Sequence, residues 1–372
     1  MNELVKKYDH WLGNSGPAAL VIREHLMPVE GRDGVLFPAT FAASEDKTFK
    51  GGYNIDKFSD GTNVCLIDSV GSQANRIEPM FMMNEYAGLV PQIVITAGSK
   101  EINLLEAGHR AGDAIVRCSE LQEELYSAFK MSQSGNAEAL AKVAPTSLVF
   151  GAWDSRETQA KLPRLIDSKI RAYDVQELTR SANYLVQQHL DYVKEKQLDE
   201  PASDAEKKEY SKRGYLNALA SATHGGVIAT GGIRRDATLH LAALRLLSAG
   251  RDEEKSLALR RYILGLAMTA FTSANASYLR QGCNLVLDSE KPRVFKVVFN
   301  DGRREDADLS HNDALAYAKV AAAEFGIGSD RFVSFSKKLA EEDLKKKEEA
   351  KNKKEAKKKG ANDKGATTNQ GD

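Results

Sequence analysis

The fold is decided by residues 165–173, which read Leu-Ile-Asp-Ser-Lys-Ile-Arg-Ala-Tyr. Apolar and polar residues alternate along this stretch, and a period of two is typical of a strand with one buried and one open face. The side chains fall into two sets: Ile166, Ile170 and Ala172 on one face, and Asp167, Lys169, Arg171 and Tyr173 on the other. Cations beside an aromatic ring suit phosphate contact and base stacking. A solvated face whose cations pair with nearby carboxylates would give the same pattern, so both interpretations stay open.

A second alternating stretch covers residues 233–241. It is expected to bury Ala237, Leu239 and Leu241 and to expose Arg234, Asp236, Thr238 and His240. Paired glycines at 225–226 and 231–232 precede it, and such pairs allow positive φ and close approach of a backbone or a ligand. They could equally form a bend that lets the strand enter a sheet. The spacing does not match GxGxxG between a strand and a helix, which excludes a dinucleotide fingerprint.

The remaining pattern predicts further strands at 19–29, 64–67, 147–150 and 294–299. Helices are expected at 254–271 and 312–325, and an amphipathic helix is expected where Leu104, Gly108, Ala111 and Ile115 recur at helical spacing. That helix would carry His109, Arg110, Asp113 and Arg117 on its polar side. Helices separated from short strands indicate an α+β fold, consistent with a ferredoxin-like or RNA-recognition-motif-like (RRM-like) sheet with insertions.

The chain divides into a body, residues 1–336, and a Lys-rich low-complexity tail, residues 337–372. Within the body, 31–61 is irregular and finger-like, and about 187–215 is a charge-rich insertion expected to protrude. The tail is expected to begin as a fraying helix and to end disordered. It could contact nucleic acid weakly, but such runs are more often only solubilising.

Composition excludes several classes of protein. The formal net charge is zero, and the tail holds twelve Lys against eight Asp and Glu, so of 52 basic and 52 acidic residues the body keeps 40 and 44. RNA binding would therefore need local patches. Cys65, Cys118 and Cys283 are too far apart for a disulfide framework or zinc site, and the seven histidines lack metal-binding spacing, so we expect neither metal nor cofactor. Without a membrane-length apolar run or a signal segment, a cytoplasmic location is expected.

Residues 68–78, Asp-Ser-Val-Gly-Ser-Gln-Ala-Asn-Arg-Ile-Glu, run from a predicted strand into a predicted helix. Unpaired backbone N–H groups and the helix dipole make such a start a natural phosphate site. Ser72, Gln73 and Arg76 are expected on its polar side. An ordinary capped helix with a solvated face fits the same residues. The stretch lacks the GxxxxGK[ST] pattern of a nucleotide-hydrolysing loop.

Taken in order, these segments resemble the backbone subunit of a type I-G (formerly I-U) CRISPR surveillance complex, a member of the repeat-associated RNA-binding superfamily. The resemblance runs over about residues 20–330 and is carried by 68–78, by Gly-His-Arg-Ala-Gly-Asp-Ala-Ile-Val-Arg at 108–117, by Phe-Gly-Ala-Trp-Asp-Ser-Arg at 150–156, by Leu-Pro-Arg at 162–164, by Ser-Lys-Ile-Arg-Ala at 168–172, by Leu-Thr-Arg at 178–180 and by Gly-Ile-Arg-Arg at 232–235.

The resemblance implies a hand-shaped, non-catalytic subunit of a Cascade-type antiviral complex. An RRM-like palm would bind the backbone of the guide RNA (crRNA), and copies would polymerise along it in a helical filament. A thumb, by position 183–226, would displace guide bases at intervals and leave the others to pair with target DNA. Other subunits of the complex would be partners. The RNA-binding residues it implies are Ser72, Gln73, Arg76, Arg156, Lys169, Arg171, Arg180, Arg234 and Arg235.

Two alternatives remain. Related type III backbone subunits cut target RNA with a loop aspartate after the first strand, and Asp33, in Gly-Arg-Asp-Gly at 31–34, has a comparable position. The chain could therefore be a metal-dependent endoribonuclease, although turn aspartates are also common for local reasons. A protein-interaction module with merely solvated polar faces is the other alternative.

Overall fold

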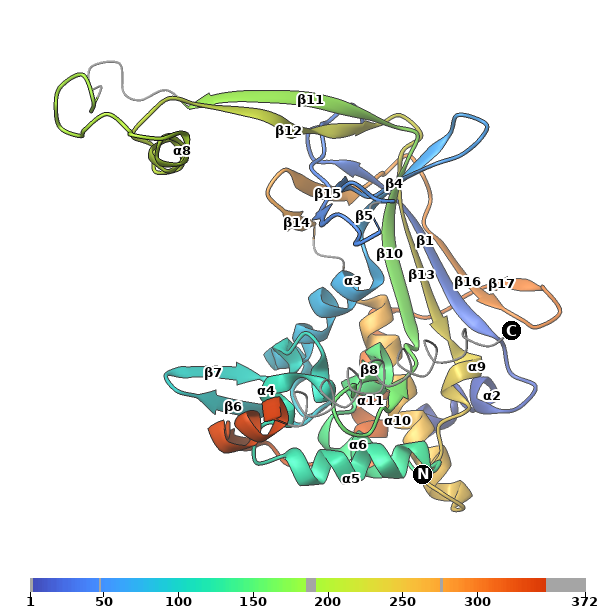
Figure 1. The fold of residues 1–372 in the computed structure, drawn as a ribbon. Helices are drawn as coiled ribbons and strands as arrows, with labels where there is room; N and C mark the ends of the chain where they lie inside the picture. The colour runs from blue at the N-terminus through green and yellow to red at the C-terminus, as the bar shows by residue number, and fades with distance from the viewer. Residues whose placement is uncertain (1–2, 47, 185–191, 275–276, 346–372) are drawn as a thin grey trace, which may run out of the picture.

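The computed structural model describes residues 3–46, 48–184, 192–274 and 277–345. Its centre is a nine-stranded curled antiparallel sheet, in which β14-β15-β1-β13-β10-β5-β4 are neighbours in that order and β16, paired with β17, branches from β1. Figure 1 shows this sheet above a helical layer. The strands are β1 (Ala19–Pro28), β4 (Ile55–Lys57), β5 (Asn63–Asp68), β10 (Ile166–Tyr173), β13 (Ile233–His240), β14 (Tyr278–Arg280), β15 (Cys283–Leu287), β16 (Val294–Val298) and β17 (Arg304–Asp306).

The sheet confirms the predicted alternation. Burial alternates residue by residue along both β10 and β13, with the side chains of one face fully buried and those of the other half-exposed. The predicted strands at 19–29, 64–67 and 294–299 are also present, within one or two residues. The mixed α+β character follows from these strands together with the helices beneath them.

Helices cover the lower part of the buried face. The two longest are α10 (Glu253–Thr272) and α11 (His311–Phe325), which pack closely because Gly265 carries no side chain: a Cβ there would lie 2.8 Å from Cα of Ala318. Leu20 and Leu239 of the sheet join their core. The other helices are α1 (Glu3–Lys6), α2 (Asp9–Leu12), α3 (Val70–Ile77), α4 (Ala114–Arg117), α5 (Gln122–Gln133), α6 (Glu138–Val143), α7 (Thr146–Phe150), α8 (Asp204–Lys212) and α9 (Leu241–Leu244). Within the described residues, no helix is long and apolar enough to span a membrane.

Smaller elements surround the sheet. They are the pairs β2 (Thr40–Phe41) with β3 (Gly52–Tyr53) and β8 (Ala152–Trp153) with β9 (Lys161–Leu162), the sheet of β6 (Ile93–Ala97), β7 (Lys100–Asn103) and β18 (Arg331–Ser334), and the 3-10 turns η1 (Glu78–Met82), η2 (Asn84–Tyr86), η3 (Leu104–Glu106) and η4 (Arg110–Gly112). The 31–61 segment contains β2, β3 and β4 between loops. The tail starts as a helix at 337–345, and its remainder lies outside the described residues.

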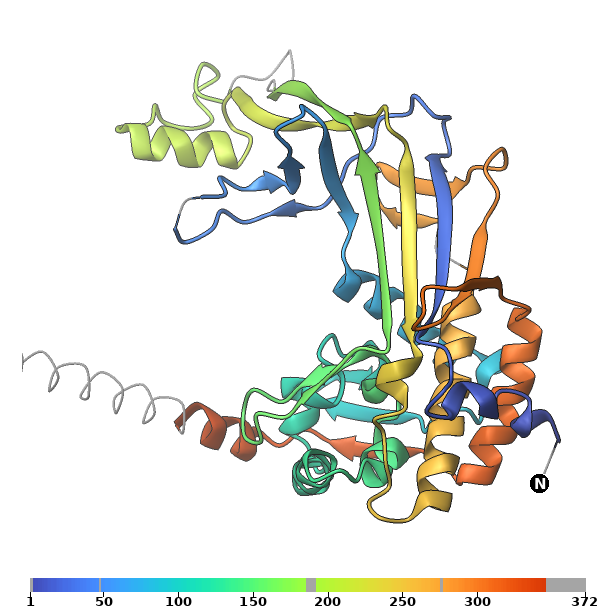
Figure 2. The same ribbon diagram turned by 90° about the vertical axis from the view of Figure 1, so that its right-hand side faces the viewer.

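A long two-stranded arm extends from the top of the sheet. Its strands β11 (Val175–Tyr184) and β12 (Ala218–Ala229) pair from Val175 with Ala229 to Tyr184 with Ala218, and α8 lies beyond them toward the tip (Figures 1 and 2). The described part of the 187–215 segment, including α8, lies in this arm, and 185–191 lie outside the described residues. The arm is longer than the 183–226 segment because β11 begins and β12 ends at the sheet edge, where Val175 pairs with Ala229.

Two predictions about local structure were wrong. Residues 104–117 form η3, η4 and α4 rather than one helix: Asn103 and Asp113 each cap a new turn with their side chains, and Arg110 adopts φ 54°. Arg110 and Arg117, expected on a polar face, are buried. Residues 147–150 belong to the helix α7 rather than to a strand, because a short, fully buried apolar run does not distinguish the two.

A belt of polar side chains crosses the buried face between two hydrophobic clusters. One cluster is the helical core, and the other lies at the upper end of the sheet around Cys65, Ile170 and Leu285. The belt consists of successive contacts: Arg235 Nε to Glu24 Oε2 (2.6 Å), Arg235 Nη1 to Ser168 Oγ (3.4 Å), Ser168 Oγ to Gln73 Oε1 (3.1 Å) and Gln73 Nε2 to Asp68 Oδ2 (2.7 Å). It ties β1, β13, β10, α3 and β5 together.

Candidate nucleic-acid interface

The open face of the sheet brings cations from three strands into adjoining rows. Because β13 pairs with β1 on one side and β10 on the other, Arg23, Asp236 and Lys169 lie in register. The next row contains His25, Arg234 and Arg171, and continues to Leu66 of β5. Figure 2 shows these strands side by side. We call the side chains of Arg23, His25, Asp167, Lys169, Arg171, Tyr173, Arg234 and Asp236 the open face.

Positive charge exceeds negative charge on the open face. Asp236 accepts hydrogen bonds from both Arg23 Nε (3.1 Å) and Arg234 Nε (2.8 Å), and Lys169 Nζ pairs with Asp167 (2.8 Å). Three cations therefore share two carboxylates, and Arg171 is a fourth cation on the same face. Arg171 forms no ion pair or side-chain hydrogen bond with any described residue. A surface with surplus, half-exposed guanidinium groups can take phosphate without first breaking every internal pair.

An aromatic ring lies among these cations. Arg234 Nη2 donates to the Tyr173 hydroxyl (2.7 Å), and the guanidinium carbon lies 4.7 Å from the ring centroid. This cation–π contact holds both side chains in place. The structure therefore confirms that the predicted cations and the aromatic ring lie together on one open face.

His25 also faces the cations. Burial lowers the pKa of His25 below its usual value, and the positive charges of Lys291, Arg234 and Arg23 lower it further. A bound polyanion would offset those charges and raise this pKa, so binding would take up a proton. RNA affinity should therefore increase as pH falls from 7.5 to about 5.5, by about tenfold for each unit of pKa change. Titrations at several pH values test this: His25→Gln should flatten the increase. His10→Gln, which changes an exposed histidine of α2 outside the open face, should retain it.

Two of the predicted RNA-binding residues are not on any surface. Gln73 and Arg235 belong to the buried polar belt, where each bonds to neighbouring side chains. The alternation explains Arg235, because neighbours along a strand point to opposite faces and Arg234 occupies the open one. Gln73 turns inward because Ser168 and Asp68 offer it a partner at each end of its amide. Neither Gln73 nor Arg235 therefore belongs to the open face.

Arg235 should instead contribute to stability. Arg235→Met would remove a cation from the buried Glu24 carboxylate, whose other oxygen, Oε1, lies 2.9 Å from Arg293 Nε. Breaking a buried pair by removing one partner leaves an undercompensated charge, so the free energy of unfolding should fall by about 3 kcal/mol. Urea denaturation measures this. An unchanged unfolding midpoint would contradict the assigned role, as would a loss of RNA affinity in fully folded protein.

The start of α3 is arranged differently from the prediction. Ser69 caps the helix, its Oγ accepting from the Ser72 N–H (3.3 Å), and the buried carboxylate of Asp68 accepts from Ser72 Oγ (2.8 Å). Asp68 also pairs with Arg76 (3.2 Å) and with Arg280 of β14 (2.9 Å). The helix start thus has a protein carboxylate beside it, and two half-buried arginines surround that single charge. Arg280 was missed because it is remote in sequence and lies in no motif.

The remaining predicted residues lie apart from the open face. Arg180 is exposed on β11 of the arm. Arg156 follows β8 in the helical part of the molecule and pairs with Asp343 (2.5 Å). Arg23 was not predicted, although its place on the exposed side of the alternating 19–29 stretch was a usable signal.

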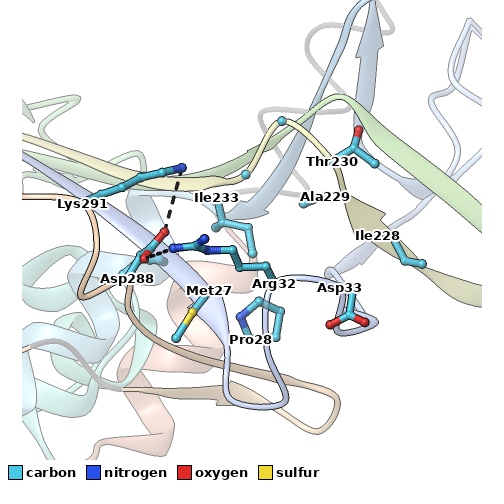
Figure 3. A pocket seen from close by; sticks show the side chains of 13 residues that line it. Met27, Pro28, Arg32, Asp33, Ile228, Ala229, Thr230, Ile233, Asp288 and Lys291 are labelled. Carbon is cyan, nitrogen blue, oxygen red and sulfur yellow. Dashed lines mark hydrogen bonds and ion pairs between the residues drawn. The ribbon is translucent and has the colours of Figure 1, made fainter.

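Asp33 is exposed at a cavity of about 390 Å³ near the end of β1 and the β12–β13 turn. Arg32 and Lys291 point toward Asp288 on one side of this cavity, and Asp33 lies apart from them (Figure 3). Within the described part of the chain, no group of three or more His, Cys, Asp or Glu side chains could hold a metal ion.

Comparison with known proteins places this geometry in context. Residues 20–177 match the family model described as CRISPR-associated protein GSU0053. The match shows a CRISPR-associated protein. It spans most of β1, then β5, α3 and β10, which are four of the five elements that the polar belt ties together. It implies a role in CRISPR defence together with other CRISPR components. No curated protein matches the chain.

Proposed function

We propose that this protein is the non-catalytic, crRNA-binding backbone subunit of a type I-G CRISPR surveillance complex. The central sheet would be its RRM-like palm, the β11–β12 arm its thumb, and the 31–61 segment its finger. Copies would polymerise along the guide RNA and present it for pairing with target DNA.

The open face is the observation that carries this proposal. Its surplus of cations, with Arg171 unpaired among the described residues, suits phosphate contact, and Tyr173 offers a ring for stacking. Such a surface grips the backbone and reads no sequence, as a subunit that coats many different guides must do. The CRISPR-associated match over 20–177 supports the same biological setting.

The nucleic acid that co-purifies with the full chain provides the test. Expressed with a repeat array and its partner proteins, the chain should retain RNA of defined length derived from that array. Nuclease digestion should then leave fragments protected at a regular interval. RNA of random origin and length, or protein free of nucleic acid, would contradict the proposal.

The second candidate function is target-RNA cleavage by Asp33, favoured by the exposure of this carboxylate beside a cavity. We expect Asp33→Ala to leave guide binding and assembly unchanged and to alter no cleavage, since the proposed function gives Asp33 no chemical role. The measurement is incubation of purified protein with guide and complementary RNA in Mg²⁺ or Mn²⁺. Metal-dependent cutting that the Asp33→Ala variant lacks would establish the nuclease instead.

A further inference from the structure

A second aromatic and basic surface lies outside the open face. It is a cleft of about 400 Å³ between the β8–β9 pair and the 108–110 segment, and its lining includes His109, Arg110, Trp153, Lys161, Pro163 and Arg164. We call it the Trp153 cleft. Trp153 is 58% exposed, although the flanking residues Ala152 and Asp154 are buried.

Local structure holds Trp153 firmly in this exposed position. Trp153 pairs across β8 and β9 with Lys161, which places a cation beside the ring. The following Asp154 is buried and accepts hydrogen bonds from the backbone N–H (3.1 Å) and the hydroxyl (2.6 Å) of Thr158, which fixes the loop between the two strands. On the other side, a Cβ on Gly112 would lie 2.7 Å from the Trp153 carbonyl oxygen, so η4 packs directly against this backbone. A large exposed ring on so well fixed a backbone is ready to accept a ligand.

The charges of the cleft are of one sign. Lys161 and Arg164 are exposed, and neither forms an ion pair with a described residue. Arg164 is anchored through Nε, which donates to the Phe150 carbonyl (3.2 Å), and a Cβ on Gly151 would lie 2.8 Å from its Cγ. The lining contains no carboxylate. The positive charge at the mouth is therefore uncompensated.

Beneath the cleft, the positive charge is balanced within the protein. Arg110 is buried, and its Nε pairs with Glu78 Oε2 at 2.6 Å. Its two terminal nitrogens donate to the Gly151 carbonyl (3.3 Å) and to Asn75 Oδ1 (3.0 Å). Arg110 therefore fixes the floor of the cleft and leaves Lys161 and Arg164 to meet a ligand.

We infer that the Trp153 cleft binds a nucleotide of single-stranded RNA, with the base stacked on Trp153 and the flanking phosphates at Lys161 and Arg164. Stacking on an aromatic ring needs only the face of the base, and two cations without an ion pair beside the ring suit the phosphates that flank that base. The inference rests on the proposed function in one respect, namely that the ligand is RNA. It adds a contact at the helical end of the molecule, separate from the open face.

Intrinsic fluorescence offers a direct test, because the chain has two tryptophans and the other, Trp11, is only 6% exposed. Titration of the full chain with a single-stranded RNA of eight adenylates should quench the emission. The quench should persist in Trp11→Phe and disappear in Trp153→Phe. Inorganic polyphosphate, which has no base to stack, should compete at high concentration without quenching.

Affinity measurements complete the test. Trp153→Ala should weaken binding of the same RNA about tenfold or more, the usual effect of losing one stacked base. Lys161→Ala with Arg164→Ala should reduce the slope of affinity against salt. Circular dichroism checks that each variant is folded, and Trp153→Phe, which keeps a ring, should retain most of the affinity.

The outcomes separate this inference from the proposed function. If wild-type protein binds RNA and Trp153→Ala binds it equally well without loss of quench, the inference is wrong and the proposed function stands. If Trp153→Ala retains RNA affinity but fails to assemble into filaments, the cleft contacts protein, which also overturns the inference. If the wild-type chain binds no RNA in any assay, the proposed function fails first.

Discussion

Lys169→Glu combined with Arg171→Glu should reduce RNA affinity by about a hundredfold or more near 0.1 M salt, equally for every RNA sequence. Each change removes a cation from the open face and places a carboxylate there. Replacing Lys169 also removes its ion pair with Asp167. Arg171 is the open-face cation that has no partner among the described residues. Because single-stranded RNA loses about 0.7 in salt slope per phosphate contact, the slope should fall by about 1.4.

The matched control is Lys130→Glu with Lys319→Glu, two exposed lysines on α5 and α11 of the helical part. This pair makes the same change in net charge away from the open face. Fluorescence anisotropy with two unrelated RNA sequences at several salt concentrations measures both variants. A loss confined to one RNA sequence, or an equal loss in the control, would show that the open face does not grip the RNA backbone.

The sheet could be predicted from the sequence because burial there is governed by a short period. In β10 and β13 one side chain in two contacts the core, so alternation alone assigns Arg171, Tyr173 and Arg234 to the open face. The same rule would place Arg235 on the buried side, but the resemblance had assigned it to the RNA together with Arg234. What the pattern could not reveal was Glu24, the remote partner that makes burial of Arg235 possible.

Helical spacing was a poorer guide, because capping residues interrupt it. The recurrence from Leu104 to Ile115 satisfies an amphipathic helix, yet Asn103 and Asp113 each stabilise the start of a separate turn. The prediction for the start of α3 was incomplete for a related reason. A capped helix predicts free N–H groups, but only the tertiary structure brings Arg280 to Asp68 and turns this corner into a cluster around one buried carboxylate.

The outer part of the arm, residues 185–217, can be removed with little expected effect on the body. Tyr184 and Ala218 are partners across β11 and β12, so a two-residue Asn-Gly turn can replace 185–217 and close a shorter hairpin. The removed part includes α8, which buries none of its residues, and a small aromatic cluster in which Tyr215 lies 5.5 Å from Tyr192 and 6.1 Å from Tyr210 between ring centroids. The body should therefore stay folded, and the open face should still bind RNA.

The variant that lacks 185–217 should no longer assemble into filaments. This loss of assembly is the second large effect that we expect. If the arm is the thumb that joins adjacent copies, the shortened chain should bind long guide RNA only as scattered monomers, because copies no longer gain affinity from one another. Light scattering and nuclease protection on long RNA should show no regular filament and no protection interval. The control is a chain ending at Lys345, which loses a similar number of residues from the Lys-rich tail and should assemble normally. Normal filaments with the wild-type interval after removal of 185–217 would place the thumb elsewhere, with the 31–61 segment the next candidate.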